Sequence, residues 1–415
     1  MSQTQTQQLQ QQLPGYNETA PDPDDCKPFQ TQIPDEVLHR KVVLIATAPI
    51  TEGCIFSNGL YQNIYIIYKM LSAMGFLPFF LQNGPADAVL NGCRVIDVQS
   101  FIKTPFPIHT YLEIGMSVDT FFRKYLKSLG ARNVKIYLGN ILNIDIETAQ
   151  FYQSAFFNHH VVGEMDEIWV SPHYEQHREY AGYINRVYNT ANMKIVPYVW
   201  DPCFITRFGR EQYRWKAAAP DSQPTYIIME PNISFQKNAL IPLLALEAYK
   251  QKHRDWNPRI IIVNGERLKA CPHFSENVAN NLAIQAHCEY RKRAIIVDLF
   301  REFPSATFIC HQVNNEYNYM ILELLYAGFP IIDNGERWAA YGYTYKENDI
   351  DGLHKCMEVA MKHVHNVDRL TSQAQTLFWR YSIHNPQVQK TWFELLRLPY
   401  PYGIDGARSN LENCN

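Results

Sequence analysis

The sequence lacks the features that mark several classes of protein. Its nine cysteines are scattered singly, with no CxxC pair, which argues against a zinc site and a disulfide framework. The formal net charge of -3 lacks the basic excess of a dedicated nucleic-acid-binding protein. No apolar run is as long as a membrane span, and the N-terminus lacks the basic-then-apolar layout of a signal peptide. We therefore expect a soluble, cytoplasmic protein without nucleic acid as a partner.

The length of 415 residues exceeds what one hydrophobic core usually supports, which predicts two domains. A Gln-rich N-terminal tail carries too little apolar sequence to fold, and a stretch rich in Pro, Gly and charge interrupts the middle of the chain. We expect this organisation: tail 1–38, N-terminal domain 39–200, linker 201–224, C-terminal domain 225–370, C-terminal helices 371–400 packing back towards the N-terminal domain, and loose tail 401–415.

Within both domains, apolar strand-like segments alternate with helical stretches. The expected strands are 41–46, 76–82, 93–99, 109–115, 134–140, 167–172, 193–200, 225–230, 259–265 and 283–290. The expected helices are 63–73, 119–129, 173–188, 238–252, 275–282 and 294–303, with residues 351–395 wholly helical. Such alternation predicts parallel sheets covered by helices on both faces. Two α/β domains of this kind face each other across a cleft, where we expect the functional site.

Residues 308–334, FICHQVNNEYNYMILELLYAGFPIIDN, read as strand, polar turn, helix and strand, with Gly328 and Pro330 ending the helix. The first loop of such a unit lies at the carboxyl edge of the sheet, and the helix N-terminus offers free N–H groups to anionic ligands. Glu323 can accept hydrogen bonds from ribose hydroxyls, and sugar hydroxyls can pair with the amides of Asn314, Asn315 and Asn318. Alternatively, Glu323 is a solvated helix residue and the asparagines only form the turn.

With these elements placed, the chain resembles the GT-B superfamily of sugar-nucleotide-dependent glycosyltransferases. It is most similar to a bacterial family known only as a domain of unknown function and grouped with the retaining enzymes. The matching stretches keep their order along the chain: SNGLYQN (57–63), LEIGMSVD (112–119), DEIWVSP (166–172), VPYVWDP (196–202), EPNISFQKNALIPLLALEAY (230–249) and HQVNNEYNYMILELLYAGFPIIDN (311–334). The resemblance implies a GT-B fold of two Rossmann-like domains with C-terminal helices.

The retaining enzymes share a pattern of Glu, seven residues, a second Glu and a Gly-x-Pro turn. Glu323, with Gly328 and Pro330, fits the second Glu, which holds the donor ribose. The first position, which faces the transferred sugar, falls on Asn315, with Glu316 displaced by one residue. This departure leaves retention and inversion at the anomeric carbon both open.

The resemblance also implies a donor diphosphate site in the loop after the first strand of the second domain. Backbone amides near Asn232 and Ser234 and the ammonium of Lys237 would bind the diphosphate, so no metal is expected. Arg291 is a second candidate, or else part of a solvated basic turn. The remaining donor-binding candidates are Asn58, Gly59, Gln62, His311 and Tyr317, although a histidine at a strand end is often structural.

In the first domain Glu113 ends a strand and is followed by Gly115, so we expect its carboxylate to face the cleft. It is a candidate for an acceptor-side base or a sugar-positioning group, or else caps the helix from Asp119. The expected catalytic residues are therefore Lys237, Glu113 and Glu316.

The resemblance implies a metal-independent hexosyl- or pentosyltransferase that uses a UDP- or GDP-linked sugar and a glycan or other acceptor. No further cofactor is expected. Two alternatives stay open: a catalytically degenerate GT-B binding or scaffold protein, and a GT-B nucleotide-sugar epimerase.

Overall fold

The computed structural model describes residues 42–51, 54–56, 59–83, 92–152, 160–209, 213–316, 318–362 and 365–398. The chain divides into two compact units. Unit 1 contains the chain up to Asp201 and again from Trp379, and unit 2 runs from Pro202 to Phe378. Of the expected linker 201–224, the part from Pro202 onward therefore belongs to unit 2, where residues Cys203–Gly209 form helix α8.

Unit 1 contains a parallel sheet of seven strands in the order β3-β2-β1-β4-β5-β6-β7. The strands are β1 (Val42–Thr47), β2 (Leu77–Gln82), β3 (Val95–Asp97), β4 (Thr110–Gly115), β5 (Arg132–Tyr137), β6 (Glu167–Val170) and β7 (Met193–Ile195). The α-helices are α3 (Gly59–Ala73), α4 (Val98–Lys103), α5 (Thr120–Ser128), α6 (Ile141–Glu147), α7 (Arg178–Ile184) and α16 (Pro386–Leu395). Shorter helical turns are η1 (Thr148–Tyr152), η2 (Pro172–His177) and η3 (Thr190–Asn192).

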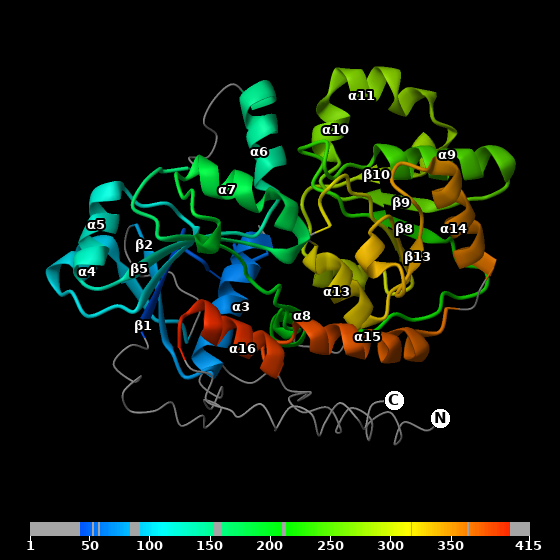
Figure 1. The fold of residues 1–415 in the computed structure, drawn as a ribbon. Helices are drawn as coiled ribbons and strands as arrows, with labels where there is room; N and C mark the ends of the chain where they lie inside the picture. Colours follow the sequence, from blue (N-terminus) through cyan, green and yellow to red (C-terminus); the bar gives the residue numbers. More distant parts are fainter. Residues whose placement is uncertain are drawn as a thin grey trace. The chain divides into compact units, whose positions relative to one another are not determined.

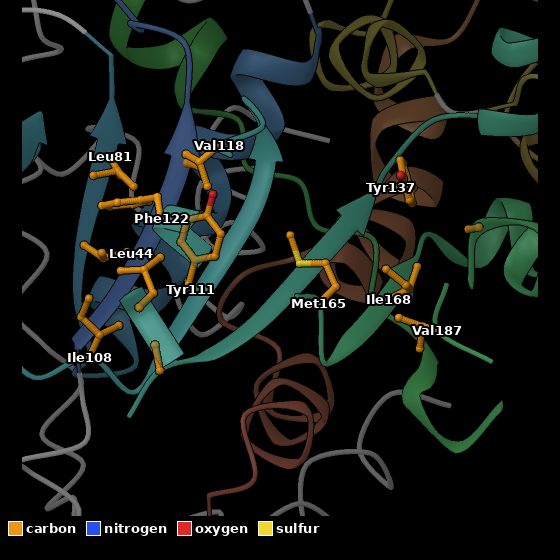
Figure 2. Packing of buried hydrophobic residues seen from close by; sticks show 14 of the residues in the cluster. Leu44, Leu81, Ile108, Tyr111, Val118, Phe122, Tyr137, Met165, Ile168 and Val187 are labelled. Carbon is orange, nitrogen blue, oxygen red and sulfur yellow. The ribbon is translucent and has the colours of Figure 1, made fainter. Parts of the chain in front are cut away.

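The core of unit 1 covers both faces of this sheet. On one face, strand residues such as Leu44, Leu81 and Tyr111 pack with Phe122 of α5 (Figure 2). On the other, α16 brings Trp392 against Trp169 of β6, with ring centroids 5.8 Å apart. The C-terminal segment therefore completes the core of unit 1, although it lies far from that core in the sequence.

Unit 2 contains a parallel sheet of six strands in the order β10-β9-β8-β11-β12-β13 (Figure 1). The strands are β8 (Thr225–Ile228), β9 (Arg259–Ile262), β10 (Cys288–Tyr290), β11 (Thr307–Ile309), β12 (Ile331–Asp333) and β13 (Tyr343–Thr344). Besides α8, the α-helices are α9 (Leu240–Lys252), α10 (Glu266–Ala270), α11 (Pro272–Asn277), α12 (Ile296–Glu302), α13 (Tyr319–Ala327), α14 (Ile350–Lys362) and α15 (Val367–Tyr381), whose last residues belong to unit 1. Short 3-10 turns are η4 (Ala279–Asn281), η5 (Ala283–His287) and η6 (Glu336–Trp338).

The expected strand, turn, helix and strand of residues 308–334 is confirmed as β11, α13 and β12. Asn318 caps the helix by accepting a hydrogen bond from Met320 N at 3.1 Å. Gly328 ends it in the left-handed conformation with φ 74°, which glycine adopts without a steric penalty. The two Rossmann-like sheets with C-terminal helices are the fold expected from the sequence.

Several expected elements differ in the structure. Of the expected strand 283–290, only β10 is a strand, because the Ala-rich first half forms the 3-10 turn η5. The expected strand 193–200 ends at Ile195, since Pro197 cannot donate to a ladder. The expected helix 275–282 is replaced by α11, which starts earlier at Pro272, and by η4. The expected helix 173–188 consists of η2 and the short α7. Residues 351–395 are interrupted before α16, where Ser382 pairs with Trp200.

Candidate functional site

The candidate site lies at the carboxyl edge of the unit 2 sheet, where β8 and β11 are neighbours. The strand order reverses at this point, because β9 and β10 lie on one side of β8 and β12 and β13 lie beyond β11. Open parallel sheets bind ligands at such a switch point. Glu230, which follows β8, accepts a hydrogen bond from His311 N, which follows β11, at 2.9 Å. One side chain therefore joins the two loops that form the edge.

The loop after β8 is held in shape by Asn232, which has φ 53°. Its Nδ2 donates to the carbonyl oxygens of Glu230 and Val263, and its Oδ1 accepts from Ala239 N at 2.9 Å. Its backbone N donates to Lys237 O at 3.3 Å and closes the loop. Both the side chain and the backbone N–H of Asn232 therefore shape the loop, so a contact from either to a donor would have to replace one of these bonds.

Ser234 and Lys237 lie within the same loop and form a backbone bridge with each other. Ser234 Oγ accepts from Gln236 N at 3.2 Å. Burial lowers the pKa of Lys237, and the neighbouring Glu230 opposes this shift. Burial likewise raises the pKa of Glu230 to about 7, against the attraction of Lys237. The buried carboxyl group of Glu230 and the amine of Lys237 thus influence each other's pKa near the switch point.

The loop after β11 carries most of the other donor candidates. Asn314 is exposed with φ 51°, and Tyr317 lies outside the described residues. Asn315 Nδ2 donates to Gln236 Oε1 at 3.0 Å, which ties this loop to the loop after β8. Glu316 accepts from Glu336 N at 3.0 Å and pairs with Arg337 Nε at 3.0 Å. Its carboxylate therefore has internal partners, which a catalytic role would have to displace.

Glu323 is buried within α13, with 5% of its surface exposed. Its Oε1 has no hydrogen-bond partner among the described residues, and burial raises its pKa to about 8. This is not the solvated helix position of the alternative interpretation. A buried carboxyl oxygen without a partner costs free energy, so an added hydrogen-bond donor would be favourable there.

A small pocket between the ends of β8, β11 and β12 brings further polar groups together. Four residues expected from the sequence line it: His311, Asn315, Glu316 and Asn318. Five residues that the sequence analysis did not identify line it as well: Glu230, Gln312, Asp333, Asn334 and Gly335. Burial raises the pKa of Asp333 to about 7. His311 is buried with Nδ1 2.8 Å from Tyr345 Oη, and burial lowers its pKa to about 4, so the imidazole is neutral at pH 7.

Glu230 and Asp333 were missed although both lie at the ends of apolar strands: Glu230 two residues after β8, and Asp333 as the last residue of β12. An acidic residue at the carboxyl end of an apolar run is the signal that finds them, and it is present in IIME and IID. Glu230 is the first residue of the stretch EPNISFQK, in which we predicted a donor contact only from the lysine and the backbone amides.

Arg291 follows β10 and is not among the residues that line the pocket. Its guanidinium donates to both carboxylate oxygens of Glu302, at 2.6 and 2.7 Å, and pairs with Glu289. These partners raise its pKa. The structure thus gives Arg291 a surface ion-pair role, and a contact to the donor stays an untested prediction.

In unit 1, Asn58 lies outside the described residues, Gly59 begins α3 and Gln62 is buried in the same helix. Glu113, which we expected to face the cleft, is buried with only 1% of its surface exposed. Arg123 Nη2 and Lys135 Nζ each lie 2.7 Å from Glu113 Oε1. These two cations outweigh the desolvation and lower the pKa of Glu113.

Three further groups donate to this carboxylate: Ser117 Oγ at 2.9 Å, Tyr111 Oη at 3.1 Å and Val118 N at 3.4 Å. A carboxylate with so many donors and a lowered pKa is a weak proton acceptor. The bonds from Ser117 and Val118 lie just before α5, whose N-cap is Asp119. The geometry therefore favours a structural role for Glu113 over that of a base.

Among the described residues, no group of three or more His, Cys, Asp or Glu side chains is arranged to hold a metal ion. None of the helices in the described part of the chain is both long and apolar enough to cross a membrane.

Comparison with known proteins gives a family and a fold. A family model described as "Protein of unknown function (DUF2827)" matches residues 44–396. No curated protein is a significant sequence match. The chain is structurally similar to a glycosyltransferase from Rickettsia africae ESF-5, at 13% identity and a TM-score of 0.55, over 86% of this chain and 98% of that one.

Two further solved structures show the same likeness. The α,α-trehalose 6-phosphate synthase from Burkholderia multivorans has 10% identity and a TM-score of 0.55, over 86% of this chain and 98% of that one. An E. coli trehalose-6-phosphate protein bound with UDP-2-fluoro glucose has 10% identity and a TM-score of 0.55, over 86% and 99%. At such low identity these matches show the fold, which is the GT-B fold.

Proposed function

This chain belongs to the DUF2827 family, and on that premise we propose that it is a glycosyltransferase. It would move a hexosyl or pentosyl group from a UDP- or GDP-linked donor to a hydroxyl of a glycan or other acceptor. Unit 2 binds the donor in this proposal, and the resemblance assigns the acceptor to unit 1. The GT-B fold supports this choice without fixing it, because one fold serves many reactions.

The observation that carries the proposal is the buried carboxyl group of Glu323. It lies in the helix between β11 and β12, five residues before Gly328, as in the pattern of the retaining enzymes. Its Oε1 has no partner within the described residues. Two ribose hydroxyls donating to this group would remove the cost of the unpaired oxygen. A purely structural helix residue at this position would be better replaced by an apolar one.

Lys237 has the charge that the reaction requires. Transfer breaks the bond between the anomeric carbon and the diphosphate oxygen, and the electron pair of that bond stays on the oxygen. The acceptor oxygen forms the new bond to the anomeric carbon, and its proton leaves to a base or to the departing diphosphate. Negative charge grows on the leaving group, so an ammonium beside it stabilises the transition state more than the ground state.

Asn315 and Glu316 lie near the place where the pattern expects its first Glu, so we assign them to the transferred sugar. Asn315 supports binding of sugar hydroxyls but cannot act as a carboxylate nucleophile or base. This observation also favours a second candidate function, a GT-B protein that binds a nucleotide sugar without transferring it.

The test is thermal stability against a panel of UDP-glucose, GDP-mannose, ADP-glucose and the bare nucleoside diphosphates. A ligand at a hundredfold over its dissociation constant stabilises by about 2.7 kcal/mol, which raises a melting temperature by roughly 5–10 °C. We expect a shift with one base family, its loss in Glu323→Ala, and strongly reduced release of nucleoside diphosphate in Lys237→Ala. Lys250→Ala, at the far end of α9, is the matched control and should behave like the wild type.

Four outcomes separate the hypotheses. A shift followed by release of nucleoside diphosphate in the presence of an acceptor supports transfer. A shift with neither release of nucleoside diphosphate in the presence of any acceptor nor conversion of the sugar supports the binding protein. Conversion of the sugar without release supports an epimerase. No shift with a folded protein contradicts the donor site.

A further inference from the structure

A hollow at the amino edge of the unit 1 sheet has no part in the proposed reaction. Its volume is about 520 Å³, which is large enough for a small-molecule ligand. The charged and amide side chains that line it are Lys127, Arg132, Asp166, Asn192 and Arg397, which lie near the starts of β5, β6 and β7 and the ends of α5 and α16. Parallel sheets bind substrates at the opposite, carboxyl edge. A ligand in this hollow would therefore be distinct from the donor and the acceptor.

Positive charge exceeds negative charge beside this hollow. Glu167, at the start of β6, is fully buried, and three cations approach its carboxylate: Arg132 Nη1 at 3.4 Å, Lys194 Nζ at 3.1 Å and Arg397 Nη2 at 2.5 Å. One carboxylate compensates only one of these charges, so an excess of two positive charges remains. Arg132 and Lys194 already compensate Glu167, and its burial therefore does not require Arg397.

The acid that lines the hollow does not cancel this excess. Asp166 Oδ1 lies 2.8 Å from Lys127 Nζ, and Asp166 Oδ2 accepts from Asn133 N at 2.8 Å. Glu164, two residues earlier, lies 3.7 Å from Lys124 Nζ and 3.6 Å from Lys127 Nζ. These two acids and two lysines compensate each other, and the excess around Glu167 stays.

Arg397 is the cation with donors available for a ligand. Its side chain is 60% exposed, and the bond from Nη2 to Glu167 is its one side-chain bond within the described residues. Its Nε and Nη1 groups are therefore available. The neighbouring Arg132 is held by Leu395 O, which accepts from its Nη2 at 2.7 Å, while its buried Nε has no hydrogen-bond partner in the described part of the chain.

The backbone of Arg397 has a conformation that glycine usually adopts. Helix α16 ends in a Schellman motif, in which Leu398 N donates to Phe393 O at 2.9 Å and Arg397 N donates to Glu394 O at 3.0 Å. Arg397 occupies the left-handed position of this motif, with φ 58°. Arg186 has the same conformation after α7, with φ 60°, but does not line the hollow. The conformation alone therefore does not mark a site, and Arg186 provides a matched control.

We propose that the hollow binds a small phosphate dianion, free or as a monoester, and that Arg397 is its principal contact. The excess of two positive charges matches the charge of the dianion, and a planar guanidinium can donate to two phosphate oxygens at once. Asn192 adds an amide donor at the same hollow. This inference goes beyond the proposed function and does not depend on it, because the donor site lies in unit 2.

Binding is measured by isothermal titration calorimetry at pH 8 and constant ionic strength, with glycerol 3-phosphate and inorganic phosphate as ligands and glycerol as the uncharged control. We expect saturable binding of the phosphates at one site and no binding of glycerol. The tighter of the two phosphates shows whether the ligand is a monoester or the free ion. Arg397→Gly should weaken binding by roughly ten- to hundredfold, because charge-assisted hydrogen bonds are lost. Arg397→Lys keeps the charge and should recover part of this loss.

The Arg397→Gly variant also separates a binding role from a structural one. Glycine suits the left-handed backbone, and Glu167 keeps two other cations. The melting temperature should therefore fall by less than about 4 °C. A larger fall together with lost binding that Arg397→Lys does not recover would show a structural role and overturn the inference.

Two further variants locate the site. Arg186→Gly should bind phosphate like the wild type, and so should Lys237→Ala, which removes a candidate phosphate ligand from the donor site. Hydrogen exchange measured by mass spectrometry should slow on addition of phosphate in peptides that contain Asp166 or Arg397.

The remaining outcomes contradict the inference in different ways. Equal affinity in wild type and Arg397→Gly overturns it, and so does the absence of saturable phosphate binding. Loss of binding in Lys237→Ala would assign the phosphate to the donor site, which overturns this inference and supports the proposed function. Failure of the nucleotide-sugar panel contradicts the proposed function alone.

Discussion

Replacing Glu113 by alanine is expected to destabilise unit 1 strongly instead of removing a catalytic base. The side chains of Arg123 and Lys135 are 0% and 5% exposed, and both depend on this carboxylate for compensation of their charges. Removing one partner of a buried ion pair leaves an uncompensated charge and typically costs about 3–5 kcal/mol. The bonds from Tyr111 and Ser117 are lost as well.

Hydrogen exchange measured by mass spectrometry reports unit 1 separately from unit 2. Peptides that cover β4 and β5 should exchange faster in Glu113→Ala by roughly two to four orders of magnitude, since about 1.4 kcal/mol corresponds to tenfold. Glu316→Ala is the matched control, because its ion pair with Arg337 is far more exposed, with 46% exposure of the arginine side chain. Glu316→Ala should lower the free energy of unfolding by less than about 1 kcal/mol.

The pH dependence has a defined sign. The folded-state pKa of Glu113 is lowered, so its contribution is fully present above the unfolded pKa of about 4.3 and is lost as pH falls through the folded pKa. The gap in unfolding free energy between wild type and Glu113→Gln should therefore shrink below about pH 4.3. Wild-type exchange in Glu113→Ala, combined with lost turnover, would refute this reasoning and restore Glu113 as a base.

Three further predictions follow from other positions. Burial raises the pKa of Glu323 to about 8, so the free energy of unfolding of the wild type should fall relative to that of Glu323→Gln as the pH rises from about 4.3 to 8. The fall should reach up to about 1.4 kcal/mol per pH unit. Urea unfolding curves that give the same pH dependence for both proteins would contradict this. Gly328→Ala should lower the free energy of unfolding by at least about 1–2 kcal/mol, because φ is 74° and the new Cβ would lie 2.5 Å from Val367 Cγ1. Gly59→Ala is the control and should be tolerated, because its new Cβ would have no atom within 4 Å. Arg291→Gln should leave donor affinity unchanged in the thermal-shift assay, since its guanidinium is bound by Glu302, and a tenfold loss would return it to the donor site.

The fold was predictable because it rests on local patterns. The apolar runs around Phe308 and Ile331, the helix between them and its glycine stop all lie within one short stretch, and each is specified by neighbouring residues. One element that was wrong is the first half of the expected strand 283–290, where two Ala and a Gln favour helical backbone over a strand and the segment forms the 3-10 turn η5.

The site was predictable only in part, because burial and charge pairing join residues that are distant in the sequence. The partners of Glu113 lie 10 and 22 residues away, and nothing in the sequence specifies that both reach it. A lysine inside the apolar strand VKIYL was a usable signal, since a cation in a buried strand requires a counter-charge. Likewise, the sequence placed Lys237 in its loop but could not show that burial lowers its pKa against the opposing effect of Glu230.

The way in which the chain leaves unit 1 and returns to it has a consequence for the gene. Trp200 N donates to Tyr381 O at 2.8 Å, so the exit and re-entry points of the backbone are adjacent, and unit 2 is one uninterrupted segment between them. In the gene, the codons of unit 2 therefore form one continuous insertion within the coding sequence of unit 1. A coding sequence in which a few codons replace residues 202–378 should therefore yield unit 1 with its α16 contacts kept.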